Sequence, residues 1–140
     1  MSKKDLRLHE PVFKGNEKAY LDECIQSGWV SSAGPFVDSF ENAIKNYTSS
    51  KHSVAVVNGT AALHLALKVL KVGADQEVIA PALTFIAPIN AISYTGAQPV
   101  FIDCDEFFNI DINKTLDFLK EETFSKDGKT YNKTTKKHLS

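Results

Sequence analysis

The chain has 140 residues, of which 43% are hydrophobic, and its formal net charge is -1 at neutral pH. That length and composition suffice for one hydrophobic core of ordinary size, and the near-neutral charge gives no electrostatic reason to expect a nucleic-acid partner. No apolar run approaches the length of a membrane span, and residues 1–11 lack the apolar core of a signal peptide. We therefore predict a soluble, cytoplasmic protein with no membrane partner.

The first third of the chain predicts two helices. Residues 17–27 carry apolar side chains at helical spacing and stop at Gly28, a residue typical of helix ends. Residues 35–47 repeat the pattern more clearly, with Pro35 suited to the first helical turn. Between them lies the segment GWVSSAGP, which is rich in small residues.

From residue 53 the pattern changes to alternating strands and helices. The predicted strands are residues 53–57, 77–80 and 99–103, and the predicted helices are residues 60–71, 85–94 and 114–122. Because the strands are apolar throughout, both of their faces are expected to be covered by helices. We predict an α/β fold with a mostly parallel sheet, in which ligands bind beyond the carboxyl ends of the strands.

Three segments follow those strand ends: residues 58–60, 82–85 and 103–105. The first, Asn58-Gly59-Thr60, opens a helix, so its backbone N–H groups and the positive end of the helix dipole form a possible phosphate seat. Simple helix capping, with Thr60 as the cap, is the alternative explanation.

Other polar residues suggest less chemistry. Asp103 and Asp105 could serve in acid–base catalysis, but solvated or capping carboxylates are the simpler interpretation. His64 lies on the polar stripe of a predicted helix and is assigned no role. Cys24 and Cys104 have no metal-ligand or redox spacing, so no metal site is predicted.

Three motifs stand in order along the chain: GWVSSAGPFVDSFE (28–41), VVNGTAALHLAL (56–67) and EVIAPALTFIAPINAISYTGAQPVFIDCD (77–105). Over roughly residues 10–120 the chain resembles the N-terminal part of the DegT-type (DegT/DnrJ/StrS) aminotransferases. These pyridoxal-phosphate-dependent enzymes aminate keto-deoxy nucleotide sugars for surface polysaccharides and related glycans. The resemblance implies part of the large domain of a fold-type I enzyme.

The resemblance also assigns residues to the cofactor, pyridoxal 5'-phosphate. Gly59, Thr60 and Ala61 would hold its phosphate through backbone N–H groups and the Thr60 hydroxyl. Phe85 would lie against the face of its pyridine ring, although a core aromatic at a helix start is the alternative interpretation.

Substrate contacts follow from the same resemblance. Ser31, Ser32 and Gly34 would belong to the rim that meets the nucleotide-sugar substrate, or they simply form a flexible loop between two helices. Glutamate is the expected amino donor, and a homodimer with shared active sites is the expected assembly.

Two groups that the chemistry needs are missing. The family binds its cofactor through a Schiff-base lysine and keeps the pyridine nitrogen protonated with a carboxylate in an EDAA-like motif; neither motif occurs in these 140 residues. We therefore assign no catalytic residue, expect the chain alone to be inactive, and interpret it as a truncated or frameshifted gene product or a fragment.

The segment after Phe124 is polar and lysine-rich. We predict a domain over residues 1–124 and a disordered tail over residues 125–140. Two other functions remain open: a non-catalytic relative that acts as a sensor or assembly partner, and an unrelated α/β domain that binds a phosphorylated ligand.

Overall fold

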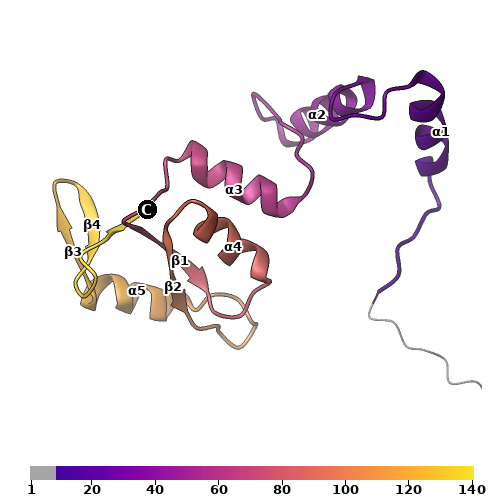
Figure 1. Cartoon of the computed structure of the whole chain (residues 1–140). Helices are drawn as coiled ribbons and strands as arrows, with labels where there is room; N and C mark the ends of the chain where they lie inside the picture. Colours follow the sequence, from indigo (N-terminus) through magenta and orange to yellow (C-terminus); the bar gives the residue numbers. More distant parts are fainter. Residues whose placement is uncertain (1–8) are drawn as a thin grey trace, which may run out of the picture. The chain divides into compact units, whose positions relative to one another are not determined.

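A computed structural model describes residues 9–140 (Figure 1). The first eight residues, which belong to the predicted domain 1–124 and to the stretch searched for a signal peptide, lie outside the described residues. The chain divides into two compact units, Met1–Ala55 and Val56–Ser140. None of the described helices is both long enough and apolar enough to cross a membrane.

The first unit contains the two helices that the sequence predicts, α1 (Glu17–Ser27) and α2 (Pro35–Thr48). Helix α1 ends at Gly28, whose φ of 76° is the left-handed value that glycine adopts without a steric cost. The rings of Tyr20 and Phe36 join the two helices, with centroids 5.1 Å apart. No residue between 9 and 55 is fully buried.

The second unit begins with α3 (Gly59–Val69), β1 (Gln76–Pro81), α4 (Ile86–Tyr94) and β2 (Gln98–Ile102). Strands β1 and β2 are parallel, and α4 is the crossover between them. Their register runs from Glu77 opposite Gln98 to Pro81 opposite Ile102. The core consists of Val72, Ala80, Ile92 and Ala97, with Leu67, Val78 and Ile89 packed against it.

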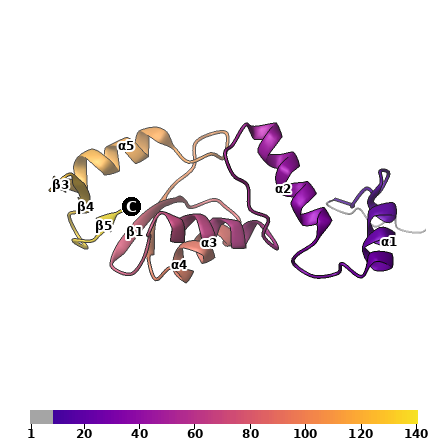
Figure 2. The same ribbon diagram turned by 90° about the horizontal axis from the view of Figure 1, so that it is seen from above.

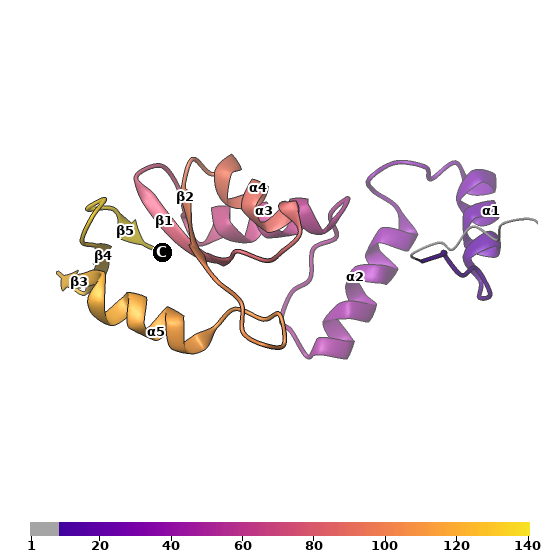
Figure 3. The same cartoon turned by 90° about the horizontal axis from the view of Figure 1, so that it is seen from below.

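Helix α5 (Ile112–Glu121) follows β2, and three short strands come after it: β3 (Thr123–Lys126), β4 (Lys129–Asn132) and β5 (His138–Leu139). Figures 2 and 3 show α3 and α4 on one side of β1 and β2, and α5 on the other. The sheet order is β2-β1-β5-β4-β3. The α/β class is confirmed, but the sheet is mixed: β2, β1 and β5 are parallel, whereas β4 and β3 pair antiparallel.

Two sequence-based expectations differ from the structure. Residues 53–57 do not form a strand, because no strand among the described residues pairs with them. The segment 125–140 is not an irregular tail. It contributes most of a β-hairpin, whose turn residues Asp127 and Gly128 both have positive φ, 52° and 73°, as a type I′ turn requires.

A buried polar pair ties this hairpin to the start of β1. The side-chain amide of Asn132 donates to Oε2 of Glu77 at 2.9 Å, and both side chains are more than 90% buried. The backbone N–H of Ser140 also donates to the Glu77 carbonyl oxygen, at 2.9 Å. A buried carboxylate needs such a donor, so Asn132 fixes the hairpin at the amino end of β1.

Candidate functional site

The start of α3 is the first of the predicted phosphate-binding elements. Asn58, not Thr60, is the helix cap: its backbone is extended and its Oδ1 accepts the Ala61 N–H at 2.9 Å. Of the three predicted backbone donors, Ala61 is therefore already engaged inside the helix cap. An asparagine at this position satisfies one of the N–H groups that a helix start leaves without a partner.

The other two predicted donors remain available. Among the described residues, neither the N–H groups of Gly59 and Thr60 nor the Thr60 hydroxyl makes a hydrogen bond. A Cβ added at Gly59 would meet no heavy atom within 4 Å, so the space beside this backbone is open. Two N–H groups, one hydroxyl and the positive end of α3 therefore form an arrangement that suits a phosphate.

Helix α4 starts at the same end of the unit as α3. Figures 1 and 3 show the two helices side by side, and the rings of His64 and Tyr94 meet edge-to-face between them at 5.7 Å. The Nε2 atom of His64 is buried there without a hydrogen-bond partner. The residues that follow the two helices also meet, since a Cβ placed at Gly96, after α4, would lie 3.4 Å from the nitrogen of Ala74, after α3. The two helices therefore run in the same direction, and their first residues lie at the same end of the strands.

Phe85 precedes α4 and is 87% exposed. With Leu83 and Thr84 it lines a largely apolar hollow of about 300 Å³ directly after β1. A core aromatic would be covered by other side chains, and no described side chain covers Phe85 in this way. An exposed phenyl ring beside an apolar hollow can contact the face of a flat ligand.

The loop after β2 is organised by its own carboxylates. Asp105 Oδ1 accepts the N–H groups of Phe107 and Asn109, both at 2.9 Å, which agrees with the capping interpretation. Lys114 donates to Asp103 Oδ2 at 2.9 Å, and this bond, with the N–H of Cys104, holds the pKa of the Asp103 carboxyl below its usual range. The same bond raises the pKa of Lys114. These contacts stabilise the loop and leave no free acid–base pair.

The predicted substrate residues lie in the first unit, between α1 and α2. The Ser31 hydroxyl donates to the Ala33 carbonyl oxygen at 3.3 Å, so it stabilises its own turn. Gly34 has a φ of 148°, and a Cβ there would lie 3.3 Å from the side chain of Trp29. Ser32 is exposed. The loop is more constrained at Gly34 than a flexible linker would be.

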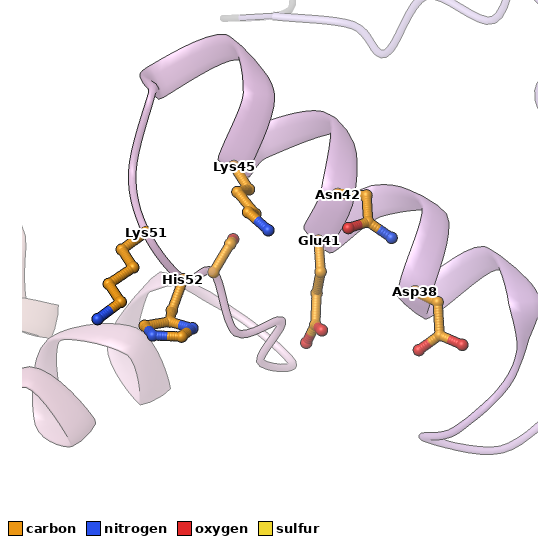
Figure 4. Close-up of a pocket in the computed structure, with 7 residues that line it drawn as sticks. Asp38, Glu41, Asn42, Lys45, Lys51 and His52 are labelled. Atoms are coloured by element: carbon orange, nitrogen blue, oxygen red, sulfur yellow. The ribbon is translucent and has the colours of Figure 1, made fainter.

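A second hollow, which sequence reasoning missed, lies beside α2 (Figure 4). Its volume is about 330 Å³, and it is lined by Asp38, Glu41, Asn42, Lys45, Lys51, His52 and Ser53. Two carboxylates and two lysines line this hollow, and Glu41 Oε1 already accepts the Ala55 N–H at 2.7 Å. With its charges balanced and Glu41 engaged, this hollow has no preference for an anion or a cation.

Comparison with known families decides the relationship. The sequence profile of the DegT/DnrJ/EryC1/StrS aminotransferase family matches residues 11–126. The chain belongs to this family. Its members depend on pyridoxal phosphate, and the match contains the α3 start, Phe85 and the 31–34 loop. Most of the β3–β4 hairpin and all of β5 lie beyond residue 126, outside the matched region.

Individual relatives agree with the family. GDP-perosamine synthase of Escherichia coli O157:H7 is 45% identical over 102 residues, which cover 73% of this chain and 28% of that enzyme. The enzyme of the same name from Caulobacter vibrioides is 47% identical over 105 residues, 74% of this chain and 28% of its own. The chain thus spans little more than a quarter of the length of these relatives.

Solved structures give the same result. A structure described as the PLP form of a sugar aminotransferase from Streptococcus pneumoniae has a TM-score of 0.73 and 32% identity, over 80% of this chain and 29% of that one. The structure of 3-amino-5-hydroxybenzoic acid synthase has a TM-score of 0.67 and 36% identity, over 75% of this chain and 28% of that one. The chain therefore has the fold of one part of the large domain of such aminotransferases.

Proposed function

We propose that this chain is the N-terminal portion of an aminotransferase that transfers an amino group, with glutamate as donor, to a keto-deoxy nucleotide sugar. The similarity to GDP-perosamine synthases carries this proposal. The available N–H groups at the start of α3 support it, because they suit the phosphate of the family's cofactor. The resemblance further suggests a role in surface polysaccharide synthesis, a cytoplasmic location and a homodimeric enzyme.

Each residue of the proposed cofactor site has one task. Gly59 and Thr60 would hold the phosphate through their N–H groups and the Thr60 hydroxyl, while Ala61 would join them only if Asn58 turned away. Phe85 would contact one face of the pyridine ring and exclude water from it. When bound, pyridoxal phosphate would supply the electron-withdrawing ring and the carrier of the amino group. Ser31, Ser32 and Gly34 remain proposed substrate contacts.

We further propose that these 140 residues do not catalyse transamination alone. They contain no EDAA-like motif to protonate the cofactor ring, and Lys68 and Lys71 lie at the end of α3 opposite to Gly59. The purified chain should show no turnover with glutamate and a GDP-linked keto sugar. Measurable glutamate-dependent turnover would overturn this part of the proposal.

A pair of substitutions at one position tests the phosphate seat. Gly59→Pro removes the N–H that would bind phosphate, yet proline suits the first helical position and the extended backbone of Asn58 before it. Gly59→Ala keeps the N–H and meets no neighbour. A hydrogen bond to a charged group contributes about 1.5–3 kcal/mol, so the proline variant should bind pyridoxal phosphate about 10-fold or more weakly than the alanine variant. Equal affinities in a fluorescence titration would refute the seat.

A sensor or assembly partner is the second candidate function. It is favoured by the same observation, a phosphate seat in a chain without the family's lysine motif. Tight binding of pyridoxal phosphate without a Schiff-base absorption band would support it, provided that adding the C-terminal part of a related aminotransferase restores no turnover. The family match argues against the remaining alternative, an unrelated phosphate-binding domain.

A further inference from the structure

The face of the β3–β4–β5 strands carries a row of three aromatic rings. Phe124 lies opposite Tyr131 on the neighbouring strand, and Tyr131 lies opposite His138 on the next. The Phe124 and Tyr131 rings are nearly parallel, with an interplanar angle of 21° and centroids 5.6 Å apart. Tyr131 and His138 are also 5.6 Å apart, tilted by 54°. The three rings therefore lie next to one another in register across three strands, and we call them the aromatic platform.

The segment that carries this platform is rich in lysine. Residues 123–140 contain five lysines, Lys126, Lys129, Lys133, Lys136 and Lys137, against one acidic side chain, Asp127, although the whole chain is slightly acidic. Lys136 Nζ lies 5.7 Å from the centre of the Phe124 ring. Phe124, Tyr131, Lys126, Lys136 and Asp127 line a hollow of about 230 Å³. Phe124 is exposed and Tyr131 is half-buried, and a cation beside such rings favours a ligand that combines a flat ring with negative charge.

The position of the platform separates it from the proposed cofactor site. Strand β5 pairs with Gln76 and Glu77, the amino end of β1. Leu83, Thr84 and Phe85 follow the carboxyl end of the same strand. The two sites therefore lie at opposite ends of β1, and most of the platform lies outside the region that the family profile matches.

We propose that this platform binds a nucleoside phosphate, with its base against the rings of Phe124 and Tyr131 and its phosphate groups at Lys126 and Lys136. The hollow is lined by five residues and suits one base, which favours a single nucleotide over a nucleic-acid strand. Base stacking on aromatic side chains and charge-assisted bonds to phosphate are the two interactions that these residues offer. Glu77 and Asn132 hold the hairpin against β1 and so keep the platform in place.

Titration of the whole 140-residue chain with four probes, GDP, guanosine, pyrophosphate and an oligothymidine, tests the proposal. GDP should bind at least 10-fold more tightly than guanosine, which lacks phosphate, or pyrophosphate, which lacks the base. In NMR spectra, its chemical-shift changes should concentrate in residues 123–140. GDP that binds no better than pyrophosphate, or that shifts mainly the residues around Gly59, overturns the proposal. An oligothymidine that binds more tightly than GDP also overturns it, in favour of a single-strand surface.

Substitutions within the hairpin separate a specific site from general positive charge. Lys136→Gln should weaken GDP binding about fivefold or more, whereas Lys129→Gln, on the same hairpin but outside the hollow, should leave it unchanged. Phe124→Leu should reduce the advantage of GDP over pyrophosphate while keeping an apolar side chain. All three side chains are exposed, so unchanged far-UV circular dichroism is the folding control. Equal losses in the two lysine variants would contradict a defined site.

Discussion

The two units use their apolar side chains differently. In the first, α1 and α2 form although no residue from 9 to 55 is fully buried, and Tyr47 is 91% exposed. In the second, Ala91 is completely buried and Ile92 is 4% exposed within a core shared by α4, β1 and the exit of α3. Local signals such as Gly28 and Pro35 define helices in the first unit, whereas among the described residues only the second unit has a buried core that stabilises it by packing.

A substitution in the core of the second unit should lower the free energy of unfolding more than any other change proposed for either unit. Ile92→Ala removes buried methyl groups and leaves a cavity, which costs about 2–5 kcal/mol of unfolding free energy. Tyr47→Ala, on exposed α2, should change that free energy by less than about 0.5 kcal/mol. Urea unfolding followed by circular dichroism measures both. If Ile92→Ala prevents folding, Ile92→Val should still cost about 0.5–1.5 kcal/mol; equal losses in the two units would contradict the comparison.

A substitution at Asn132 tests whether a polar side chain also contributes more to stability in the second unit than in the first. Asn132→Ala leaves the buried Glu77 carboxylate without its amide donor, which should cost about 1–3 kcal/mol. Asn42→Ala, at an exposed asparagine of α2, serves as the matched control and should be nearly neutral. Chemical denaturation gives both values. Removing the buried acceptor as well, with Glu77→Leu added to Asn132→Ala, should recover part of the loss.

Gly34 is a sterically restricted position in the first unit, although that unit has no buried core. Its φ of 148° and ψ of 172° lie in a region that essentially only glycine occupies, and Trp29 blocks the place of a Cβ. Gly34→Ala should therefore destabilise the 29–35 turn by about 1–3 kcal/mol. Trp29 fluorescence and hydrogen exchange of α2 report this locally, with Gly28→Ala as a control that has a positive φ but no close neighbour. An unchanged Trp29 signal would show that the turn adapts.

The smallest expected effect belongs to the exposed Asp103–Lys114 pair. Because the pKa of folded Asp103 lies below its unfolded value of 3.8, its contribution to stability is present above that pH and is lost as the pH falls through the folded value. The raised pKa of Lys114 acts oppositely: its contribution is full below 10.5 and is lost as the pH rises beyond the folded value. Lys114→Gln should raise the pKa of Asp103 in an NMR titration, and added salt should do the same in the native chain.

The sequence predicts much of this fold because many of its elements have local causes. The helices lie within a few residues of their expected bounds, and β1 and β2 were recognised as short apolar runs. Residues 53–57 were wrongly predicted as a strand, since a strand depends on a partner that no local pattern supplies. The sequence pattern does not reveal the hairpin, because its lysines, threonines and serine resemble a polar tail, although Asp127-Gly128 is a usable turn signal.

The candidate site was predictable to a similar degree. Gly59 and Thr60 lie at a helix start, as expected, and Phe85 precedes another. The engagement of Ala61 by Asn58 could not be foreseen, because Asn58 and Thr60 can both cap a helix and only the backbone geometry selects one. The roles of Ser31, Ser32 and Gly34 remain predictions from the family.

The pairing of β1 on both of its edges has a consequence for how the chain folds as it is synthesised. Strand β2 follows β1 closely and pairs through a compact crossover, whereas β5 arrives about 60 residues after Gln76. On a ribosome, β1, α4 and β2 can assemble while the opposite edge of β1 still has unpaired backbone groups. Until His138 and Leu139 emerge, Gln76 and Glu77 on that edge lack their partner strand and can pair with strands of other nascent chains, so slow synthesis of residues 103–139 favours aggregation.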